Sequence, residues 1–261
     1  MKRLYVILAL VLIFICTWWL GALPINTSSA TAPNQNILHL SEKLLYAVKT
    51  EAATDSLETA LASLKMDELV TSLSNNTARK TFWINLYNAW YQLLFIREKK
   101  ANPEIFTDKS ILIAGHYFSL DDIEHGILRK YRWKYSMGYL PQFLPSKLIK
   151  RLAVSKIDYR IHFALNCGAK SCPPIAFYQY EKLEQQLELA TKSFLRSETD
   201  IDTVNKKVHA SKIMQWFKGD FGGKKGICSL LSKVLNQDFT GYEILFKEYD
   251  WSANLKNYYT E

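Results

Sequence analysis

The segment from about Asn76 to Lys99 places the strongest constraint on how this 261-residue chain can fold. Its apolar residues recur at helical spacing, and Asn76 and Thr77 are suitable residues to begin a helix. Ile84 and Tyr91 add bulky side chains opposite the main apolar stripe, which consists of Phe82, Trp83, Leu86, Trp90, Leu93 and Leu94. A helix that is apolar nearly all round is a buried one, so we expect this segment in the interior.

The rest of the body combines helices with short strands. Helical spacing of apolar residues occurs over 37–48, 57–73, 180–194, 212–217 and 226–235. Residues 111–118 indicate a hairpin that turns at Gly115-His116, and residues 204–208 indicate a turn between two further strands. Ser119 and the carboxylates that follow it are typical of a helix start.

Residues 160–166 alternate in polarity, which predicts a strand. Ile161, Phe163 and Leu165 would share one face of this strand, and His162 and Asn166 would lie on the other. The unbroken body predicts an α+β fold: a predominantly helical single domain with a small sheet, preceded by an N-terminal apolar helix.

The N-terminus predicts export. Lys2 and Arg3 precede a run from Leu4 to Leu20 that contains no charged residue. Residues 1–30 are therefore expected to be a signal peptide or a membrane anchor, with the body outside the cytoplasm as a membrane-anchored, periplasmic or secreted protein. Residues 31–42 are expected to be a polar tether and residues 43–261 the single domain.

The charge does not predict a nucleic-acid partner. The chain has 33 Lys and Arg against 25 Asp and Glu, a formal net charge of +8. Pairs such as Lys99-Lys100 and Lys206-Lys207 are isolated, and the sequence contains no zinc-finger or RNA-binding motif. Weak attraction to anionic lipid is the more natural use of the excess. The expected partners are the membrane and a protein partner or small-molecule substrate.

Cysteines supply the most suggestive chemistry. Cys167 and Cys172 flank a turn of small residues after the expected strand. In an exported body they could form a disulfide, one of them could be a reactive thiol, or both could be buried structural thiols. A zinc site built from these sulfurs, His125 and His162 has suitable ligand types, but the histidines lack local pairing, so no metal or cofactor is predicted. Cys228 has the helical spacing of a core residue, and Cys16 lies within the apolar run.

Geometry restricts which histidine could serve a thiol. Along an extended strand His162 and Cys167 would lie roughly 16 Å apart, so Cys172, after a turn, is the easier partner. His125 is the second candidate base, but a helix directs adjacent Glu124 and His125 differently, so only one would face a shared pocket.

Buried polar residues are expected to hold the fold together. Asn85 and Asn88 are neighbours on one face of the central helix, where they would tie down a loop or line a pocket. Arg129 and Arg160 are expected to pair with carboxylates such as Asp121, Asp122 or Asp158.

Several stretches of the chain together resemble one known family. The matching residues are Phe82 to Ala89, Ser119 to Arg129, Arg160 to Ala169, Ser171 to Pro174 and Tyr249 to Ser252. In this order they resemble the domain of unknown function 547 family of bacteria and plants, with Ala253 where the family usually has Leu. The resemblance implies one self-contained domain and no established activity. In plant relatives it is attached to coiled-coil segments, which suits an interaction role.

Two functions are consistent with these residues. The first is a thiol-dependent hydrolase or acyl transferase, with Cys172 or Cys167 as nucleophile and His125 or His162 as base. Backbone amides of residues 168–171 would stabilise the oxyanion, and Asn85 or Asn166 would orient the base. The alternative is a non-catalytic binding or scaffold module at the membrane with a structural disulfide.

Overall fold

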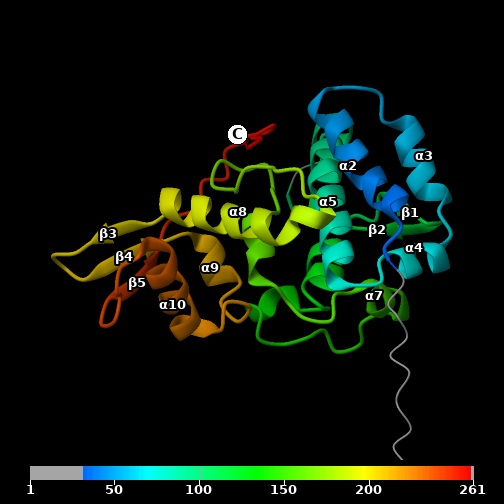
Figure 1. Ribbon diagram of the computed structural model, residues 1–261. Helices are drawn as coiled ribbons and strands as arrows, with labels where there is room; N and C mark the ends of the chain where they lie inside the picture. Colours follow the sequence, from blue (N-terminus) through cyan, green and yellow to red (C-terminus); the bar gives the residue numbers. More distant parts are fainter. Residues whose placement is uncertain (1–31, 101, 260–261) are drawn as a thin grey trace, which may run out of the picture. The chain divides into compact units, whose positions relative to one another are not determined.

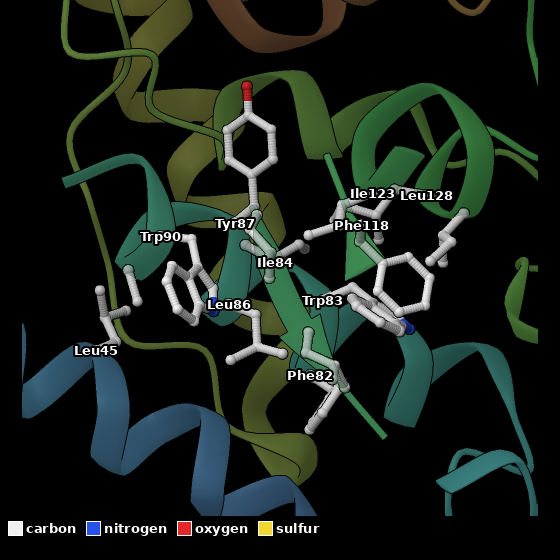
Figure 2. Close-up of a cluster of buried hydrophobic side chains, with 14 of the residues drawn as sticks. Leu45, Phe82, Trp83, Ile84, Leu86, Tyr87, Trp90, Phe118, Ile123 and Leu128 are labelled. Atoms are coloured by element: carbon white, nitrogen blue, oxygen red, sulfur yellow. The ribbon is translucent and has the colours of Figure 1, made fainter. Parts of the chain in front are cut away.

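Helix α5 (Asn76–Glu98) is the centre of the fold, as predicted. The structure is a computed structural model and describes residues 32–100 and 102–259. The side chain of Asn75, one residue earlier than predicted, caps the helix by accepting a hydrogen bond from the backbone N–H of Ala78. Almost every side chain from Ala78 to Leu94 is buried. In Figure 2, Leu45, Phe118 and Ile123 surround the aromatic side chains of this helix.

The first hydrophobic cluster forms around α5. It is enclosed by α2 (Gln35–Lys49), α3 (Asp55–Ser63), α4 (Met66–Ser72), α6 (Glu104–Thr107), α7 (Lys147–Leu152) and a hairpin of β1 (Ile111–Ile113) and β2 (His116–Phe118) (Figure 1). The hairpin is confirmed, with Ile111 opposite Phe118. Its turn is Ala114-Gly115, one residue earlier than predicted, and both residues have positive φ.

The second cluster forms around the C-terminal helices. These are α8 (Leu183–Glu198), α9 (Lys212–Trp216) and α10 (Gly223–Leu235). A three-stranded sheet accompanies them: β4 (Lys207–Ala210) pairs antiparallel with β3 (Asp200–Asp202) and parallel with β5 (Glu243–Phe246). The turn predicted between two strands at residues 204–208 is confirmed for β3 and β4.

Two boundaries differ from the prediction. Residues 57–73 are two helices, because the carbonyls of Leu61 and Ala62 accept the turn amides of the hairpin instead of continuing α3. The helix predicted over 37–48 is confirmed as α2, but it begins at Gln35, so residues 35–42 are helical and the tether expected over 31–42 is shorter. The side chain of Asn34 caps this helix, and Ile37 and Leu38 are buried.

The strand predicted over 160–166 is wrong: Tyr159–Phe163 form the 3-10 helix η3. Asp158 caps this helix through the backbone N–H of Arg160. Ile161 packs in the first cluster and Phe163 in the second. The alternation therefore arises because the segment passes between two cores, and it does not mark one face of a sheet.

Overall, the fold is mixed α+β with about 52% helix and small sheets. Residues 32–261 cluster as one compact unit. Within the described residues, no helix is long and apolar enough to cross a membrane. The expected N-terminal apolar helix, signal peptide or anchor lies outside the described residues.

Candidate functional site

A cavity of about 240 Å³ opens where the two clusters meet. Its polar lining comes from α5, from the helix after the hairpin, from η3 and from the loop that follows η3. Its aromatic lining comes from α9 and from the segment after β5. The lining residues include Tyr87, Glu124, His125, His162, Cys167, Cys172, Trp216, Phe217, Tyr249 and Trp251. Both predicted cysteines and both predicted histidines thus contribute to one cavity.

Glu124 and His125 both line this cavity, contrary to the prediction that only one could. They lie on η1 (Asp122–Leu128), which is a π-helix. Its wider turn reduces the angle between consecutive side chains, and such turns are frequent at functional sites. The N-terminal end is fixed by reciprocal bonds: the Ser119 hydroxyl accepts from the Asp122 N–H, and the Asp122 carboxylate accepts from the Ser119 N–H.

The carboxyl group of Glu124 is the most perturbed acid in the cavity. Burial raises its pKa to about 7, although the charge of Arg129 opposes the shift. The hydroxyl of Tyr87 lies 3.1 Å from Glu124 Oε2 and donates to it. Figure 2 shows this hydroxyl pointing away from the apolar cluster. Burial also raises the pKa of Tyr87, so the phenol keeps its proton while Glu124 titrates near neutral pH.

His125 is held as a neutral imidazole. Arg129 Nη1 donates to His125 Nδ1 over 2.7 Å, which leaves the ring proton on Nε2. That Nε2 lies 3.6 Å from a carboxylate oxygen of Asp121. Burial, followed by the positive charge of Arg129, holds the pKa of His125 well below its ordinary value.

A buried cluster around Asp220 orients the second histidine. Asp220 Oδ2 accepts from Arg129 Nε at 2.6 Å and from His162 Nε2 at 2.9 Å. Burial lowers the pKa of His162 to about 4, so the ring is neutral and its proton points at Asp220. Burial opposes ionisation of Asp220, but hydrogen bonds from His162 and Arg129 hold its pKa below the ordinary value. The ring of His162 also stacks on Phe217, with 3.9 Å between the ring centroids.

Cys167 and Cys172 form a disulfide, one of the three alternatives that the sequence left open. The hydroxyl of Tyr249 lies 3.0 Å from the sulfur of Cys167 and 2.9 Å from that of Cys172. A disulfide offers no thiolate, and its sulfurs are not zinc ligands. Across residues 32–100 and 102–259, no group of three or more His, Cys, Asp or Glu is placed to hold a metal ion.

The disulfide loop is joined to the segment after β5. The N–H of Lys170 donates to the carbonyl of Ser252, and the N–H of Asn254 donates to the carbonyl of Gly168. The N–H of Ser171 donates to the backbone carbonyl of Asp250, and the N–H of Gly168 donates to the side-chain oxygen of Asn166. Three of the four amides expected to stabilise an oxyanion, those of Gly168, Lys170 and Ser171, are therefore engaged within the fold. The bonds instead position Tyr249 and Trp251 as a wall of the cavity.

The buried asparagines hold loops to the core. Asn85 exchanges two hydrogen bonds with the backbone of Tyr178, at 2.8 and 3.0 Å. Asn88 binds the carbonyl of Ala164 and the N–H of Asn166. Asn166 in turn donates to Pro173. These bonds use the amides that were considered for orienting a base, and Asp220 orients His162 instead.

Of the two arginines expected to pair with carboxylates, Arg160 pairs with Asp158 at 2.7 Å, as predicted. Arg129 pairs with Asp220, which lies 91 residues away and was not predicted. Tyr87 and Tyr249 were also missed. The available signals were a phenol within an otherwise apolar buried helix and an aromatic pair at Tyr249 and Trp251.

Comparison with known proteins identifies one family. A family model described as "Protein of unknown function, DUF547" matches residues 70–195. This range includes α5, η1, η3 and the disulfide, whereas Trp216, Asp220 and Tyr249 lie beyond it. No curated protein and no solved structure matches the chain.

Proposed function

Residues 70–195 match the DUF547 family of proteins of unknown function, so the match supplies no activity. We propose from the cavity that the chain is a hydrolase or acyl transferase in which Glu124 acts as general base and acid. The observation that carries the proposal is the Glu124 carboxyl itself. It lines the cavity, bonds to Tyr87, and has a pKa raised by burial to about 7. A catalytic acid–base group works best when its pKa lies near the operating pH.

In this proposal the two carboxyl oxygens of Glu124 have different tasks. Tyr87 donates to Oε2 and fixes the plane of the carboxylate. Oε1 takes a proton from a water or a hydroxyl group that attacks an acyl carbon in the cavity. The protonated acid then returns the proton to the leaving group as the bond to the acyl carbon breaks. His125, whose Nδ1 lies 3.8 Å from Oε1, is neutral and so does not neutralise the base.

The walls indicate the class of substrate. Phe106, Ile213, Trp216, Phe217 and Trp251 supply an apolar and aromatic lining. The volume of about 240 Å³ lies just below the roughly 300–1,000 Å³ of pockets for drug-sized ligands. A small ester or amide with an apolar acyl or aryl group fits these properties.

The proposed place of action is outside the cytoplasm, as an exported or membrane-anchored protein. The Cys167–Cys172 disulfide supports this proposal, because disulfides persist in oxidising compartments and are rare in the cytosol. The basic start and the apolar run from Leu4 to Leu20 support it independently.

A thiol mechanism is the second candidate. One observation favours it: His162, oriented by Asp220, lines the same cavity as both sulfurs. A nucleophile, a base and a group that orients the base are the components of a catalytic triad. This candidate requires the disulfide to be reduced by a dithiol before a thiolate exists.

Hydrolysis of p-nitrophenyl esters of increasing acyl length by the full chain tests both candidates. Glu124→Gln is expected to lower turnover at least about 100-fold, and Glu68→Gln, on the exposed surface of α4, is expected to leave it unchanged. Activity that appears only with dithiothreitol and is lost in Cys172→Ser would support the thiol candidate. Wild-type turnover by Glu124→Gln would refute the acid–base proposal. A wild-type chain that neither cleaves nor binds the esters would support the non-catalytic module.

A further inference from the structure

One stretch of the chain carries the whole positive excess of the body. No acidic residue occurs between Glu124 and Asp158, whereas eight basic residues do: Arg129, Lys130, Arg132, Lys134, Lys147, Lys150, Arg151 and Lys156. Beyond Ala30 the chain has 31 basic and 25 acidic residues, a net charge of +6. Without these eight the remainder is slightly acidic, so the charge is not dispersed as its isolated lysine pairs suggested.

The same stretch contains residues 133–144, which we call the 133–144 loop. This loop exposes large apolar side chains. Half of the exposed large hydrophobic residues in the described chain belong to it: Trp133, Tyr135, Met137, Tyr139, Leu140, Phe143 and Leu144. Phe143 is 94% exposed and Leu144 is 81% exposed. So many exposed large apolar side chains within one short segment favour an interaction surface.

Backbone bonds hold these side chains outward. The N–H of Trp133 donates to the carbonyl of Leu140 at 3.0 Å and so closes the loop on itself. The N–H of Gly219 donates to Met137 at 2.7 Å and so joins the loop to the body. Gly138 packs so closely on Asp220 that a Cβ atom would lie 2.4 Å from its carboxylate oxygen. The exposed side chains are therefore presented by a braced loop.

Charge identifies the partner. Arg129 and Lys134 are engaged by carboxylates of the body. Lys147, Lys150 and Lys156, just beyond the loop, are exposed. An apolar surface with basic residues beside it complements a partner whose interior is apolar and whose surface is negatively charged. A second copy of the chain would instead bring like charges together, which opposes association.

We propose that the 133–144 loop docks on an anionic lipid bilayer. Phe143 and Leu144 enter the boundary of the acyl region, and Trp133, Tyr135 and Tyr139 lie at the level of the headgroups, where aromatic residues with a polar edge are favoured. The exposed lysines contact anionic headgroups. None of the exposed apolar side chains of the loop lines the cavity of Glu124, so the docking holds whether or not the proposed function does.

A fluorophore at position 143 of the reconstituted full chain tests the proposal locally, independently of the apolar N-terminal run. Phe143→Cys, labelled with an environment-sensitive dye in a Cys16→Ser, Cys228→Ser background, is compared in two kinds of vesicle. One is pure phosphatidylcholine, and the other also contains phosphatidylglycerol. We expect a blue-shifted emission that is quenched by nitroxide lipids and is stronger with phosphatidylglycerol. A label at Val204→Cys, on the β3–β4 turn and 89% exposed in the wild type, should keep the spectrum of water.

Charge variants measure the electrostatic part. Lys147→Gln with Lys150→Gln is expected to lower the docking equilibrium constant about 30-fold, since each lysine near an anionic surface is worth about a fivefold change. The matched pair Lys206→Gln with Lys207→Gln should leave it unchanged. A water-like label at 143 in both vesicles would overturn the proposal, as would equal docking in both. A blue shift that grows with the protein-to-lipid ratio would indicate that the loop contacts a second copy of the chain. A blue shift present before lipid is added would indicate that the chain's own apolar run covers the loop. Either shift would also overturn it.

Discussion

Replacing Glu124 by glutamine is expected to remove a pH dependence from the free energy of unfolding. Burial raises the pKa of this carboxyl from 4.5 to about 7. In the unfolded chain the group ionises at its ordinary value, so between these pKa values the folded state binds more protons than the unfolded state. The stability that Glu124 contributes is therefore complete below its unfolded pKa and is lost as the pH rises through about 7.

The magnitude follows from the two pKa values. A tenfold change in proton affinity corresponds to about 1.4 kcal/mol, so complete ionisation of Glu124 costs the folded state about 3 kcal/mol. Glutamine has the same shape, can still accept the hydrogen bond from Tyr87, and does not ionise. Well above neutral pH the variant should be more stable than the wild type by about 2–3 kcal/mol. In mild acid the two should differ by less than about 1 kcal/mol.

Urea unfolding followed by tryptophan fluorescence, at a series of pH values, measures this difference. The wild-type curve alone is insufficient because His162 acts in the opposite direction. Burial lowers the pKa of this histidine to about 4, so its contribution is lost as the pH falls from its unfolded value through about 4. Subtracting the wild type from the variant cancels that effect, and Glu68→Gln controls for loss of a charge. A difference that stays constant within about 0.5 kcal/mol from mild acid to mild base would show that burial does not raise the pKa of Glu124 as described.

Urea unfolding also tests the other packing arguments. Asp220→Ala leaves a buried guanidinium without its carboxylate partner and should lower the free energy of unfolding by about 3–5 kcal/mol. Asp67→Ala, at an exposed ion pair, should lower it by less than about 1 kcal/mol. Equal losses in the two variants would contradict the importance of the buried pair. Gly168→Ala would place a Cβ atom 2.3 Å from an aromatic ring of α5 and should cost more than about 2 kcal/mol. Gly115→Ala, also at positive φ but with nothing within 4 Å of the added Cβ atom, should lower the free energy of unfolding by about 1 kcal/mol. A larger loss in Gly115→Ala than in Gly168→Ala would contradict the crowding at Gly168. Reducing the Cys167 disulfide with dithiothreitol should lower stability by about 2 kcal/mol through loop entropy, and an unchanged midpoint would count against this estimate.

Local patterns predicted the elements whose structure depends on near neighbours. The two-sided apolar character of α5 required burial on all sides, and the fold buries it. The β1–β2 hairpin and the β3–β4 turn followed from short-range alternation and turn residues. The resemblance to the family, carried by segments such as Phe82 to Ala89, is confirmed over residues 70–195.

The candidate site depended on contacts that local patterns do not encode. The polarity of residues 160–166 alternates because the segment packs against both hydrophobic clusters. The alternation therefore predicted a strand, whereas the structure has the 3-10 helix η3. That change brings His162 into the cavity that both sulfurs line. The π-helical turn likewise places Glu124 beside His125. Asp220 pairs with Arg129 across 91 residues, a separation over which a single sequence offers no pairing signal.

The distribution of the cavity along the chain has a consequence for modularity. The family match ends at residue 195, but the partner of Arg129 and the wall formed by Tyr249 lie later in the sequence. A fragment of residues 70–195 would leave the buried guanidinium of Arg129 without its carboxylate partner, and the cavity would lack the wall that includes Tyr249. The unit that folds around this cavity is therefore larger than residues 70–195, and comparisons with other proteins need to align residues well past this range.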